Sequence, residues 1–338
     1  MTPLAAWDVP QGSRSEPLGD GLINETFRVV HGGDTVGVLQ RLNTDIFRPT
    51  VHLDIQAITA HLKARGLPTT ELVPTRSGDL WHTADDGSVW RMLSWIGDRT
   101  VSKVDDPADA RSGGALIARF HAALSDLDHR FHHVRPGAHD TDRHMDTLMR
   151  AMDAHRSHRL WWEATDLGET ILEGWRRWEG PTDLPTRIIH GDLKISNLRF
   201  AGSEALALVD LDTLQDGGLD AELGDAMRSW CNPRAENVED ASFDAAIFAA
   251  AMEGYASERS GVTQAEWLSI GAGTERICWE LAARFAADAL NESYFGWDPA
   301  FGTRGDHNLL RARGQASLAR SVRDQRAALD AKLQELWG

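Results

Sequence analysis

Short runs of alternating hydrophobic and polar positions fill the first hundred residues, which predicts β-strands around one helix. Residues 26–30 and 35–42 are strand-like and flank the segment His31-Gly32-Gly33-Asp34, which is typical of a two-residue hairpin turn. A helix is expected over residues 49–66, where apolar residues recur every three or four positions. Two later runs with the strand-like pattern span residues 71–75 and 89–96.

From residue 105 onward the pattern is mainly helical. Asp105-Asp106-Pro107 is a favourable helix start, because an acidic residue caps the first turn and proline fits its first position. A short strand-rich island interrupts the helices, and its predicted strands span residues 187–189, 198–200 and 205–211. Helices resume near Asp220, and the long ones are expected over residues 243–255, 266–290 and 306–336. We therefore expect an α+β protein with a small strand-rich N-terminal lobe (residues 1–97) and a larger, mainly helical C-terminal lobe (residues 98–338).

The composition is that of an ordinary globular protein, with 42% hydrophobic and 25% charged residues among 338. The longest apolar stretch, Ala245 to Met252, is far shorter than the ~20 residues of a membrane helix. Two cysteines are too few for a disulfide framework, and no secretory signal follows Met1, so we expect a cytoplasmic protein that binds no membrane. The net charge of −16 argues against nucleic-acid binding. The sequence gives no indication of oligomeric state.

The most informative stretch is His190-Gly191-Asp192-Leu193-Lys194-Ile195-Ser196-Asn197, which follows an apolar run. A second apolar run then delivers Asp210. Phosphoryl transfer needs an acceptor for the proton of the substrate hydroxyl and oxygen ligands for the Mg²⁺ that accompanies a nucleotide. Asp192 suits the proton acceptor, Asn197 and Asp210 suit Mg²⁺, and Lys194 can reach the transferring phosphate.

A polar turn between two strands is the alternative explanation, with Asp192 capping the turn and Asn197 in a bend. Two features favour phosphotransfer instead. A strand carries Asp210 at a suitable distance after the loop, and Lys194 is one of only four lysines in the chain. The combination is more specific than any one of these residues.

This pattern resembles the aminoglycoside phosphotransferase/choline kinase superfamily, which shares the protein-kinase-like fold. Within it, the chain is most similar to the N-acetylhexosamine 1-kinases, through segments spread over essentially the whole chain. These segments lie at residues 21–27, 38–44, 210–214, 224–228, 294–295 and 306–309. The resemblance implies a bilobal protein-kinase-like fold, ATP as co-substrate, Mg²⁺ as cofactor and a sugar as the acceptor.

On the nucleotide side, the resemblance implies that Gly21, Asn24 and Thr26 lie near the ATP phosphates, although an ordinary loop would also explain this stretch. Protein kinases hold these phosphates with a lysine on a following strand, and no lysine precedes Lys63 here. Strand alternation turns only one side chain of the pair Gln40-Arg41 toward the cleft. We choose Arg41 because it is charged; an exposed arginine is the alternative.

The acidic partner of this cation is expected on the next helix, where Asp54 is the nearest candidate. Residues 90–97 resemble the strand that enters the hinge between the lobes. There the backbone of Ser94, Trp95 and Ile96 would bond adenine, whereas the alternative is a plain core strand.

On the acceptor side, Arg284 follows Leu281 on the apolar face of a predicted helix. It is either an arginine at the rim of the core or a cation that reaches sugar hydroxyls in the cleft. The resemblance favours the second reading for Arg284 and Tyr294, and extends it to Arg228.

The function expected is transfer of the ATP γ-phosphate to a sugar hydroxyl, the anomeric 1-OH of an N-acetylhexosamine (GlcNAc or GalNAc). One alternative is a related kinase for an aminoglycoside, another amino sugar, choline or homoserine. Residues 98–338 carry a balance of −13, which suits a polycationic acceptor. The other alternative is a catalytically inactive nucleotide-binding module.

Overall fold

In the computed structural model of the chain, the residues described are 2–19, 23–134, 136–234 and 236–338. The strands are β1 (Arg14–Pro17), β2 (Glu25–His31), β3 (Asp34–Arg41), β4 (Leu72–Val73), β5 (His82–Thr83), β6 (Val89–Leu93), β7 (Arg99–Thr100), β8 (Thr186–Ile189), β9 (Leu198–Ala201), β10 (Glu204–Leu208) and β11 (Gln215–Gly218). The helices are α1 (Val51–Ala64), α2 (Pro107–Leu124), α3 (Thr141–Ala154), α4 (Trp161–Arg176), α5 (Leu219–Trp230), α6 (Ala245–Glu258), α7 (Gln264–Leu268), α8 (Ile270–Asn291) and α9 (Arg304–Trp337).

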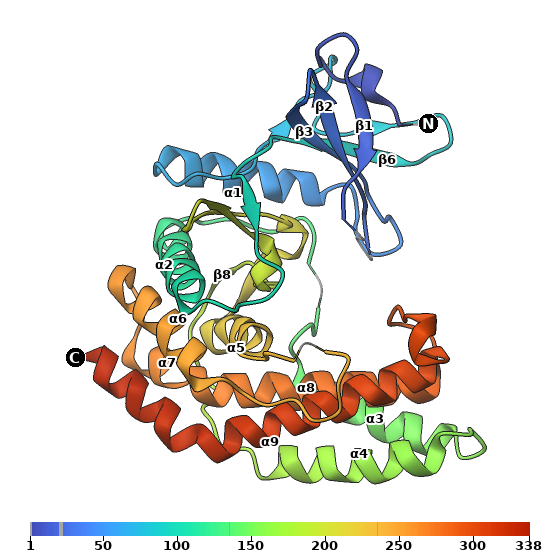
Figure 1. Ribbon diagram of the computed structural model, residues 1–338, viewed down its shortest axis with the longest axis vertical. Coiled ribbons are helices and arrows are strands. Elements are labelled where there is room, and N and C mark those ends of the chain that lie inside the picture. Colours follow the sequence, from blue (N-terminus) through green and yellow to red (C-terminus); the bar gives the residue numbers. More distant parts are fainter. Residues whose placement is uncertain (1, 20–22, 135, 235) are drawn as a thin grey trace.

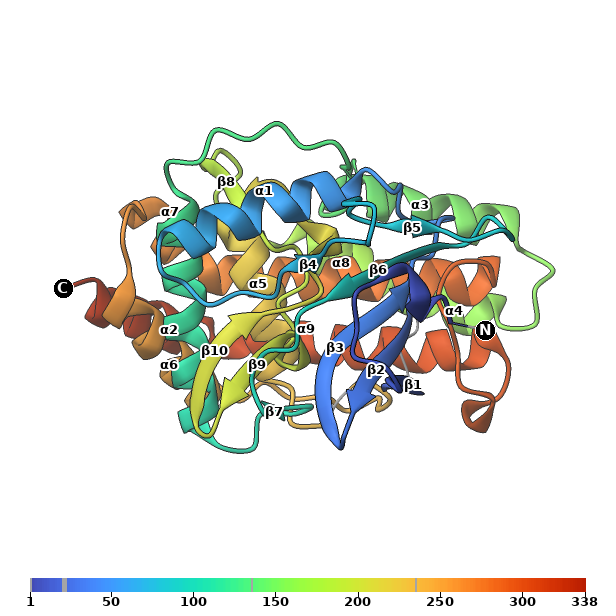
Figure 2. The same cartoon turned by 90° about the horizontal axis from the view of Figure 1, so that it is seen from above.

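The N-terminal part is an antiparallel sheet in the order β1-β2-β3-β6-β4, with β5 paired to β6. Strands β2 and β3 form the predicted hairpin, in which His31 pairs with Asp34 across Gly32 and Gly33. Both glycines have positive φ, 61° and 101°, as the turn requires. The single helix α1 crosses beside this sheet and lies between it and the helical part (Figures 1 and 2).

A small apolar cluster stabilises the N-terminal sheet. Trp7, Val29, Leu39, Trp90 and Met92 are all buried together there. The Trp7 indole also donates a hydrogen bond to the Val73 carbonyl, 2.9 Å away, and so fastens the N-terminal segment to β4.

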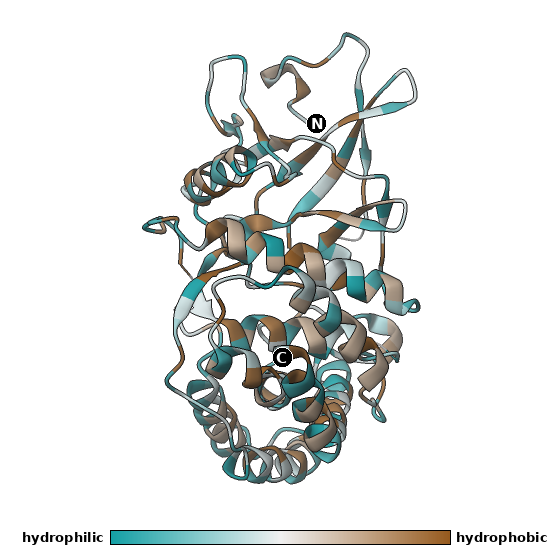
Figure 3. Cartoon of the chain, turned by 90° about the vertical axis from the view of Figure 1, so that its left-hand side faces the viewer, coloured by the Kyte–Doolittle hydropathy of each residue, from teal (hydrophilic) through white to brown (hydrophobic). Residues whose placement is uncertain are grey.

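The C-terminal part is a layered helical assembly, with α8 along α9 and α5, and α2 along α6. Most of the buried apolar side chains of the chain belong to this one core. Figure 3 shows hydrophobic and hydrophilic residues mixed along these helices, as expected of helices that bury one side. The predicted α+β, kinase-like bilobal architecture is confirmed. Among the described residues, no helix is long and apolar enough to cross a membrane.

The predicted strand-rich island needs correction, because its strands belong to two ladders. β9 and β10 pair with each other and with β7, whereas β8 pairs with β11. The third predicted strand is also too long, since β10 ends at Leu208 and Asp210 has a φ of 64° that no strand accommodates. Asp210 therefore lies on a sharp turn, two residues beyond the strand that was expected to carry it.

The helix predicted over residues 266–290 is two helices. The short α7 starts with a capping box, in which the Thr263 and Glu266 side chains each bond the other's backbone. Ser269 separates α7 from α8, and its hydroxyl donates a hydrogen bond to the Glu266 carbonyl over 2.7 Å.

Candidate active site

The loop after β8 is held in place by a buried carboxylate of α5. Glu222 accepts hydrogen bonds from the backbone amides of His190 (2.8 Å) and Gly191 (2.9 Å). Burial alone would raise the pKa of Glu222, but the hydrogen bond and charge of His121, helped by His190 and by the Gly191 amide, lower it on balance. An ionised Glu222 thus fixes the entrance of the loop.

Glycine is required at position 191. Its φ is 79°, and a Cβ atom there would lie 2.6 Å from the Thr213 carbonyl oxygen. The Thr213 hydroxyl in turn donates to the His190 carbonyl over 2.8 Å. These contacts bring the loop after β8 against the segment that follows Asp210.

Three of the predicted catalytic and metal residues meet in this loop. Lys194 Nζ lies 2.9 Å from Asp192 Oδ2. The Asn197 amide nitrogen donates to the Asp192 backbone carbonyl (2.8 Å) and to the Asp192 carboxylate (3.1 Å). With its nitrogen committed, Asn197 retains its amide oxygen as an acceptor.

The charge state of Lys194 follows from its neighbours. Burial alone would lower the pKa of Lys194, but the charge and hydrogen bond of Asp192, together with the charge of Asp210, raise it. Lys194 is therefore a fixed cation between two carboxylates.

Asp210 is the least satisfied carboxylate of the group. Among the residues that the structure describes, none donates a hydrogen bond to its side chain. Burial and the negative charges of Asp212 and Asp192 raise the pKa of Asp210, against the opposing charges of Lys194 and Arg91. A carboxylate in this state is disposed to bind a cation.

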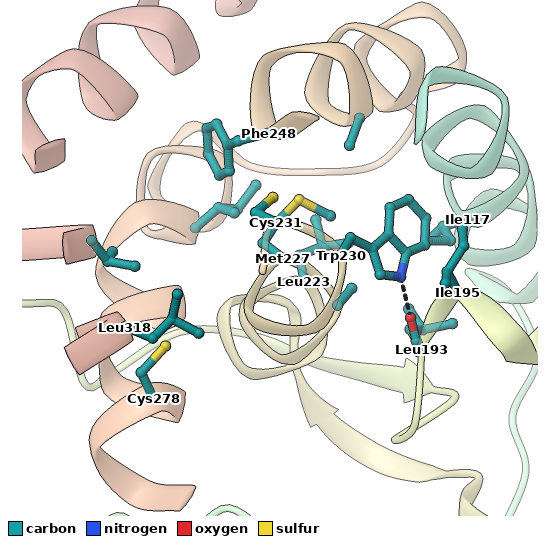
Figure 4. Close-up of a cluster of buried hydrophobic side chains, with 14 of the residues drawn as sticks. Ile117, Leu193, Ile195, Leu223, Met227, Trp230, Cys231, Phe248, Cys278 and Leu318 are labelled. Atoms are coloured by element: carbon teal, nitrogen blue, oxygen red, sulfur yellow. Dashed lines mark hydrogen bonds between the residues drawn. The ribbon is translucent and has the colours of Figure 1, made fainter. Parts of the chain in front are cut away.

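Behind the loop, Trp230 of α5 anchors its centre. The indole Nε1 donates a hydrogen bond to the Leu193 carbonyl over 2.7 Å. The ring lies beside Ile117 and Ile195, and Leu223 is on the same helix as Trp230 (Figure 4). The loop is thus fixed from its polar start by Glu222 and from its apolar middle by Trp230.

The buried cation that faces Asp212 is Arg91 of β6, whereas Arg41 is the residue expected from the sequence on this side of the sheet. Arg91 is fully buried and forms a two-pronged ion pair with Asp212, whose Nη2–Oδ2 distance is 2.7 Å. Gln40, opposite Arg91 on β3, accepts from Arg91 Nε over 2.9 Å. Arg41 consequently faces the other side of the strand, where it is exposed and pairs with Glu25 at 2.8 Å.

Asn24 joins the loop between β1 and β2 to the same carboxylate. Its amide nitrogen donates to Asp212 Oδ2 over 2.8 Å, and its oxygen accepts from the Asn43 amide. The Thr26 hydroxyl accepts from the Gln40 amide over 3.0 Å. Gly21, the third residue predicted here, lies outside the described residues.

Asp54 was the expected partner of a phosphate-binding cation, but its carboxylate bonds histidine residues instead. It is buried on α1 and accepts hydrogen bonds from His129, His132 and His133, which all precede α3. The acidic partner of Arg91 is Asp212.

The hinge prediction is altered for Ser94. Its amide donates to the Glu71 carbonyl (2.8 Å), and its carbonyl accepts from Thr70, because the pairing of β6 with β4 continues past the strand end. The Ile96 carbonyl accepts from Arg199, whose guanidinium stacks on the Trp95 ring at 4.6 Å. The hydrogen bonds of Ser94 are therefore used within the sheet.

The acceptor-side residues gather around Asp225 of α5. Arg228 Nε bonds Asp225 Oδ1 at 2.9 Å and also pairs with Glu236. Burial alone would raise the pKa of Asp225, but the charges of Arg228, His139 and Arg284 lower it. Lys194 lies close enough to feel the Asp225 charge, which links this cluster to the catalytic loop.

Arg284 and Tyr294 share a neighbour, Phe295. The Arg284 guanidinium lies over the Phe295 ring at 5.5 Å, and Tyr294 meets that ring edge-on at 4.8 Å. Tyr294 is 61% exposed. The structure therefore pairs Arg228 with Asp225, places Arg284 over Phe295 and leaves Tyr294 exposed beside the same ring.

Sequence reasoning missed three residues of this site: Arg91, Glu222 and Asp225. Arg91 carried a signal, since an arginine inside an otherwise apolar strand must find a buried partner. Asp225 stands three residues before Arg228, the spacing of a helical ion pair. Glu222 carried no local signal, because only the tertiary fold brings it to the His190 amide.

Comparison with known proteins agrees with this geometry. Residues 14–259 match the model of the phosphotransferase enzyme family known as APH. Among solved structures, the amicoumacin kinase hAmiN in complex with AMP-PNP, Ca²⁺ and Ami is similar, with a TM-score of 0.64 and 12% identity over 93% of this chain and 90% of that one.

Two further structures are similar in fold. The microcompartment-associated aminopropanol kinase has a TM-score of 0.63 and 17% identity over 97% of this chain and 96% of that one. An aminoglycoside phosphotransferase from Alicyclobacillus acidocaldarius has a TM-score of 0.59 and 14% identity over 98% of this chain and 94% of that one.

The fold is that of the kinase-like phosphotransferases. The chain belongs to the phosphotransferase enzyme family.

Proposed function

We propose that the protein is an ATP-dependent sugar kinase that phosphorylates the anomeric 1-OH of an N-acetylhexosamine. The observation that carries the proposal is the meeting of Asp192, Lys194 and Asn197 in one loop, with Asp210 beside them. Residues 1–97 form the nucleotide-binding lobe in this proposal, and residues 98–338 supply the catalytic loop and the acceptor site.

Each residue of the loop has a separate task. Asp192 orients the acceptor hydroxyl and takes its proton as the hydroxyl oxygen bonds the γ-phosphorus, while the bond from that phosphorus to the β–γ bridging oxygen breaks and ADP leaves. Lys194 carries a permanent positive charge and offsets the charge that develops on the transferring phosphoryl oxygens. Asn197 fixes the Asp192 carboxylate through its amide nitrogen, 3.1 Å away.

The donor set next to the loop fits a hard divalent cation such as Mg²⁺. Asp210 offers a carboxylate to which no described residue donates a hydrogen bond, and Asn197 offers an amide oxygen. Both are the oxygen ligands that Mg²⁺ prefers. When bound there, Mg²⁺ would neutralise charge on the nucleotide phosphates. The AMP-PNP and Ca²⁺ bound to the amicoumacin kinase agree with this proposal.

The nucleotide would lie under the loop between β1 and β2. Asn24 holds this loop to Asp212, and Arg91 of β6 pairs with the same carboxylate. Because Arg91 is fully paired with Asp212, it fixes the metal-binding segment and does not itself hold the phosphates. Adenine would bond the backbone of Trp95 and the Ile96 amide, since the Ser94 groups are used within the sheet.

The acceptor site favours a neutral sugar over a polycation. Although residues 98–338 are acidic overall, Asp225 is paired with Arg228, and the charge of Arg284 also lowers the pKa of Asp225. Glu236 is likewise paired with arginine. These paired groups donate and accept hydrogen bonds, as sugar hydroxyls require, whereas an ammonium group would meet like charges. Arg228, Arg284 and Tyr294 are the residues we assign to sugar binding.

A panel assay tests this proposal. The protein is incubated with ATP, Mg²⁺ and, in turn, GlcNAc, GalNAc, glucosamine, kanamycin, choline and homoserine. ADP release identifies the acceptor, and phosphorus NMR of the product locates the phosphate. An anomeric phosphate on an N-acetylhexosamine supports the proposal. An aminoglycoside phosphate would replace it with the principal alternative, and no product with any acceptor would favour an inactive nucleotide-binding module.

A further inference from the structure

Two histidine rings and a buried carboxylate converge at the junction of α1 with the helical part of the chain. Asp54 lies on α1, and only 1% of its side chain is exposed. His129 and His132 lie between the end of α2 at Leu124 and the start of α3 at Thr141. His129 Nε2 is 2.8 Å and His132 Nδ1 is 3.0 Å from the same atom, Asp54 Oδ1.

We propose that Asp54, His129 and His132 form a binding site for a divalent transition-metal ion, with Zn²⁺ as the best fit. The three ligand atoms all lie within 4.8 Å of one another. Zinc bonds of 2.0–2.1 Å place tetrahedral ligands roughly 3.3 Å apart, so the two ring-to-carboxylate separations are each within ~0.5 Å of this spacing. The separation between the two rings closes by rotation of His132, which is half-exposed.

The carboxylate is held in place without the rings. The His133 backbone amide donates to Asp54 Oδ2 over 2.9 Å, and the His132 amide donates to Oδ1 over 2.9 Å. Hydrogen bonds of this kind orient ligating carboxylates in metal sites. These amide hydrogen bonds would remain when the imidazole nitrogens give up their hydrogen bonds to the carboxylate and bind a metal ion beside it.

One of the two rings is also fixed by packing. His129 meets Phe131 edge-on, with ring centroids 5.0 Å apart at 89°, and 11% of its side chain is exposed. His132 is 48% exposed, which gives the ion a route from solvent and leaves room for a water ligand. The site thus combines one packed imidazole with one that solvent can reach.

The chemistry of the ligands separates this site from the one in the catalytic loop. Imidazole nitrogen favours Zn²⁺, Ni²⁺ and Cu²⁺, whereas the carboxylate and amide oxygens of Asp210 and Asn197 favour Mg²⁺. A bound ion would tie α1 to the segment that leads into α3. Its binding would therefore stabilise the folded chain.

Calorimetric titration of the tag-free protein with Zn²⁺, in saturating Mg²⁺, tests the site. We expect one equivalent of Zn²⁺ to bind and to raise the unfolding temperature. His129→Asn and His132→Asn should each weaken zinc binding at least tenfold, because asparagine can still bond Asp54 but removes the imidazole ligand. His31→Asn, at the exposed hairpin turn, is the matched control and should bind zinc as the wild type does.

Asp210→Asn separates this site from the catalytic loop and should also retain zinc binding. Unfolding temperatures measured in EDTA establish that each variant is folded before titration. The proposal is overturned if the wild type binds no zinc in saturating Mg²⁺, or if both histidine variants bind it with unchanged affinity. Neither result depends on kinase activity, so the zinc titration tests the metal site independently of the proposed function.

Discussion

At the residue scale, the buried ion pair between Arg91 and Asp212 joins two distant parts of the chain. Both side chains are 1% exposed. Burial alone would lower the pKa of Arg91 and raise that of Asp212, but their mutual attraction and hydrogen bonds reverse both directions. The pair joins β6 to the segment after Asp210, so it connects the N-terminal sheet to the C-terminal part of the chain.

Arg91→Met should reduce the free energy of unfolding by about 3–5 kcal/mol, because it leaves Asp212 charged and unpaired in the interior. Urea unfolding followed by circular dichroism measures this loss. The double variant Arg91→Met/Asp212→Asn should recover part of the stability, since the stranded charge is gone. A loss below about 1 kcal/mol in the single variant would show that water reaches Asp212 and that the pair contributes little.

Asp210 offers a second prediction at this scale, on pH. Its pKa is raised in the folded chain by burial and by the charges of Asp212 and Asp192, so its ionisation opposes folding. Without metal, Asp210→Asn should therefore raise the unfolding temperature at pH 7. The gain should shrink as the pH falls through the raised pKa and be lost below the ordinary value of 3.8, where Asp210 is protonated in both states.

Thermal unfolding in EDTA at pH 7 and pH 3.5 checks the direction for Asp210. The same variant should need more Mg²⁺ for activity, which distinguishes relief of charge from a general improvement in packing. A lower unfolding temperature for Asp210→Asn at pH 7 would contradict the account of an unsatisfied carboxylate.

At the scale of elements, the long helix α9 depends on its first turn. Thr303 and Asp306 form a capping box, and Arg159 bonds Asp306 at 2.7 Å. The hydrogen bond from Arg159 lowers the pKa of Asp306 to about 2, with a further contribution from Thr303. The folded pKa lies below the ordinary value of 3.8, so this stabilisation is present above pH 4 and is lost as the pH falls toward 2.

Asp306→Ala should accordingly lower the free energy of unfolding by about 1 kcal/mol at pH 7, the usual effect of removing a helix cap. The difference from the wild type should narrow between pH 4 and pH 2. Asp324→Ala, an exposed position within α9, is the control and should change stability by less than about 0.5 kcal/mol. A difference that persists unchanged at pH 2 would rule out the ionised cap as its source.

Elements with a strong local signal could be predicted from the sequence, and those made by distant pairing could not. The hairpin at Gly32-Gly33 and the start of α2 at Asp106 have local turn and capping chemistry, and both are confirmed. The strands β7 and β11 are short, and they exist only because β9 and β8 pair with them. No periodicity in four residues or fewer reveals such a strand.

The same distinction separates the site residues. The stretch from His190 to Asn197 is continuous in sequence, so its candidate residues could be picked out as one motif. Arg91 and Asp212 are 121 positions apart, and the pairing of β3 with β6 decides that Gln40 rather than Arg41 faces them. Strand alternation limited the choice to two residues, but only the sheet settled it.

At the scale of the whole molecule, the two parts of the chain share an apolar core through α1, and polar contacts around one loop add to it. Asn24 and Arg91 reach Asp212 from the N-terminal sheet, while Glu222 and Trp230 hold the loop from α5. In the proposed function, Asp192 would lie between the nucleotide and the acceptor. The position of Asp192 at that junction is the basis of the proposed phosphotransfer.

The most direct test of this account is the turnover of Asp192→Asn with the acceptor that the panel identifies. We expect sugar-dependent ADP release to fall by ~10²–10⁴-fold, the usual contribution of a catalytic base. The unfolding temperature and the circular dichroism spectrum should be unchanged. Asp216→Asn, at the exposed position of β11, should retain wild-type turnover as the matched control. Near-normal turnover by a correctly folded Asp192→Asn would contradict the assignment of Asp192 and, with it, the proposed mechanism.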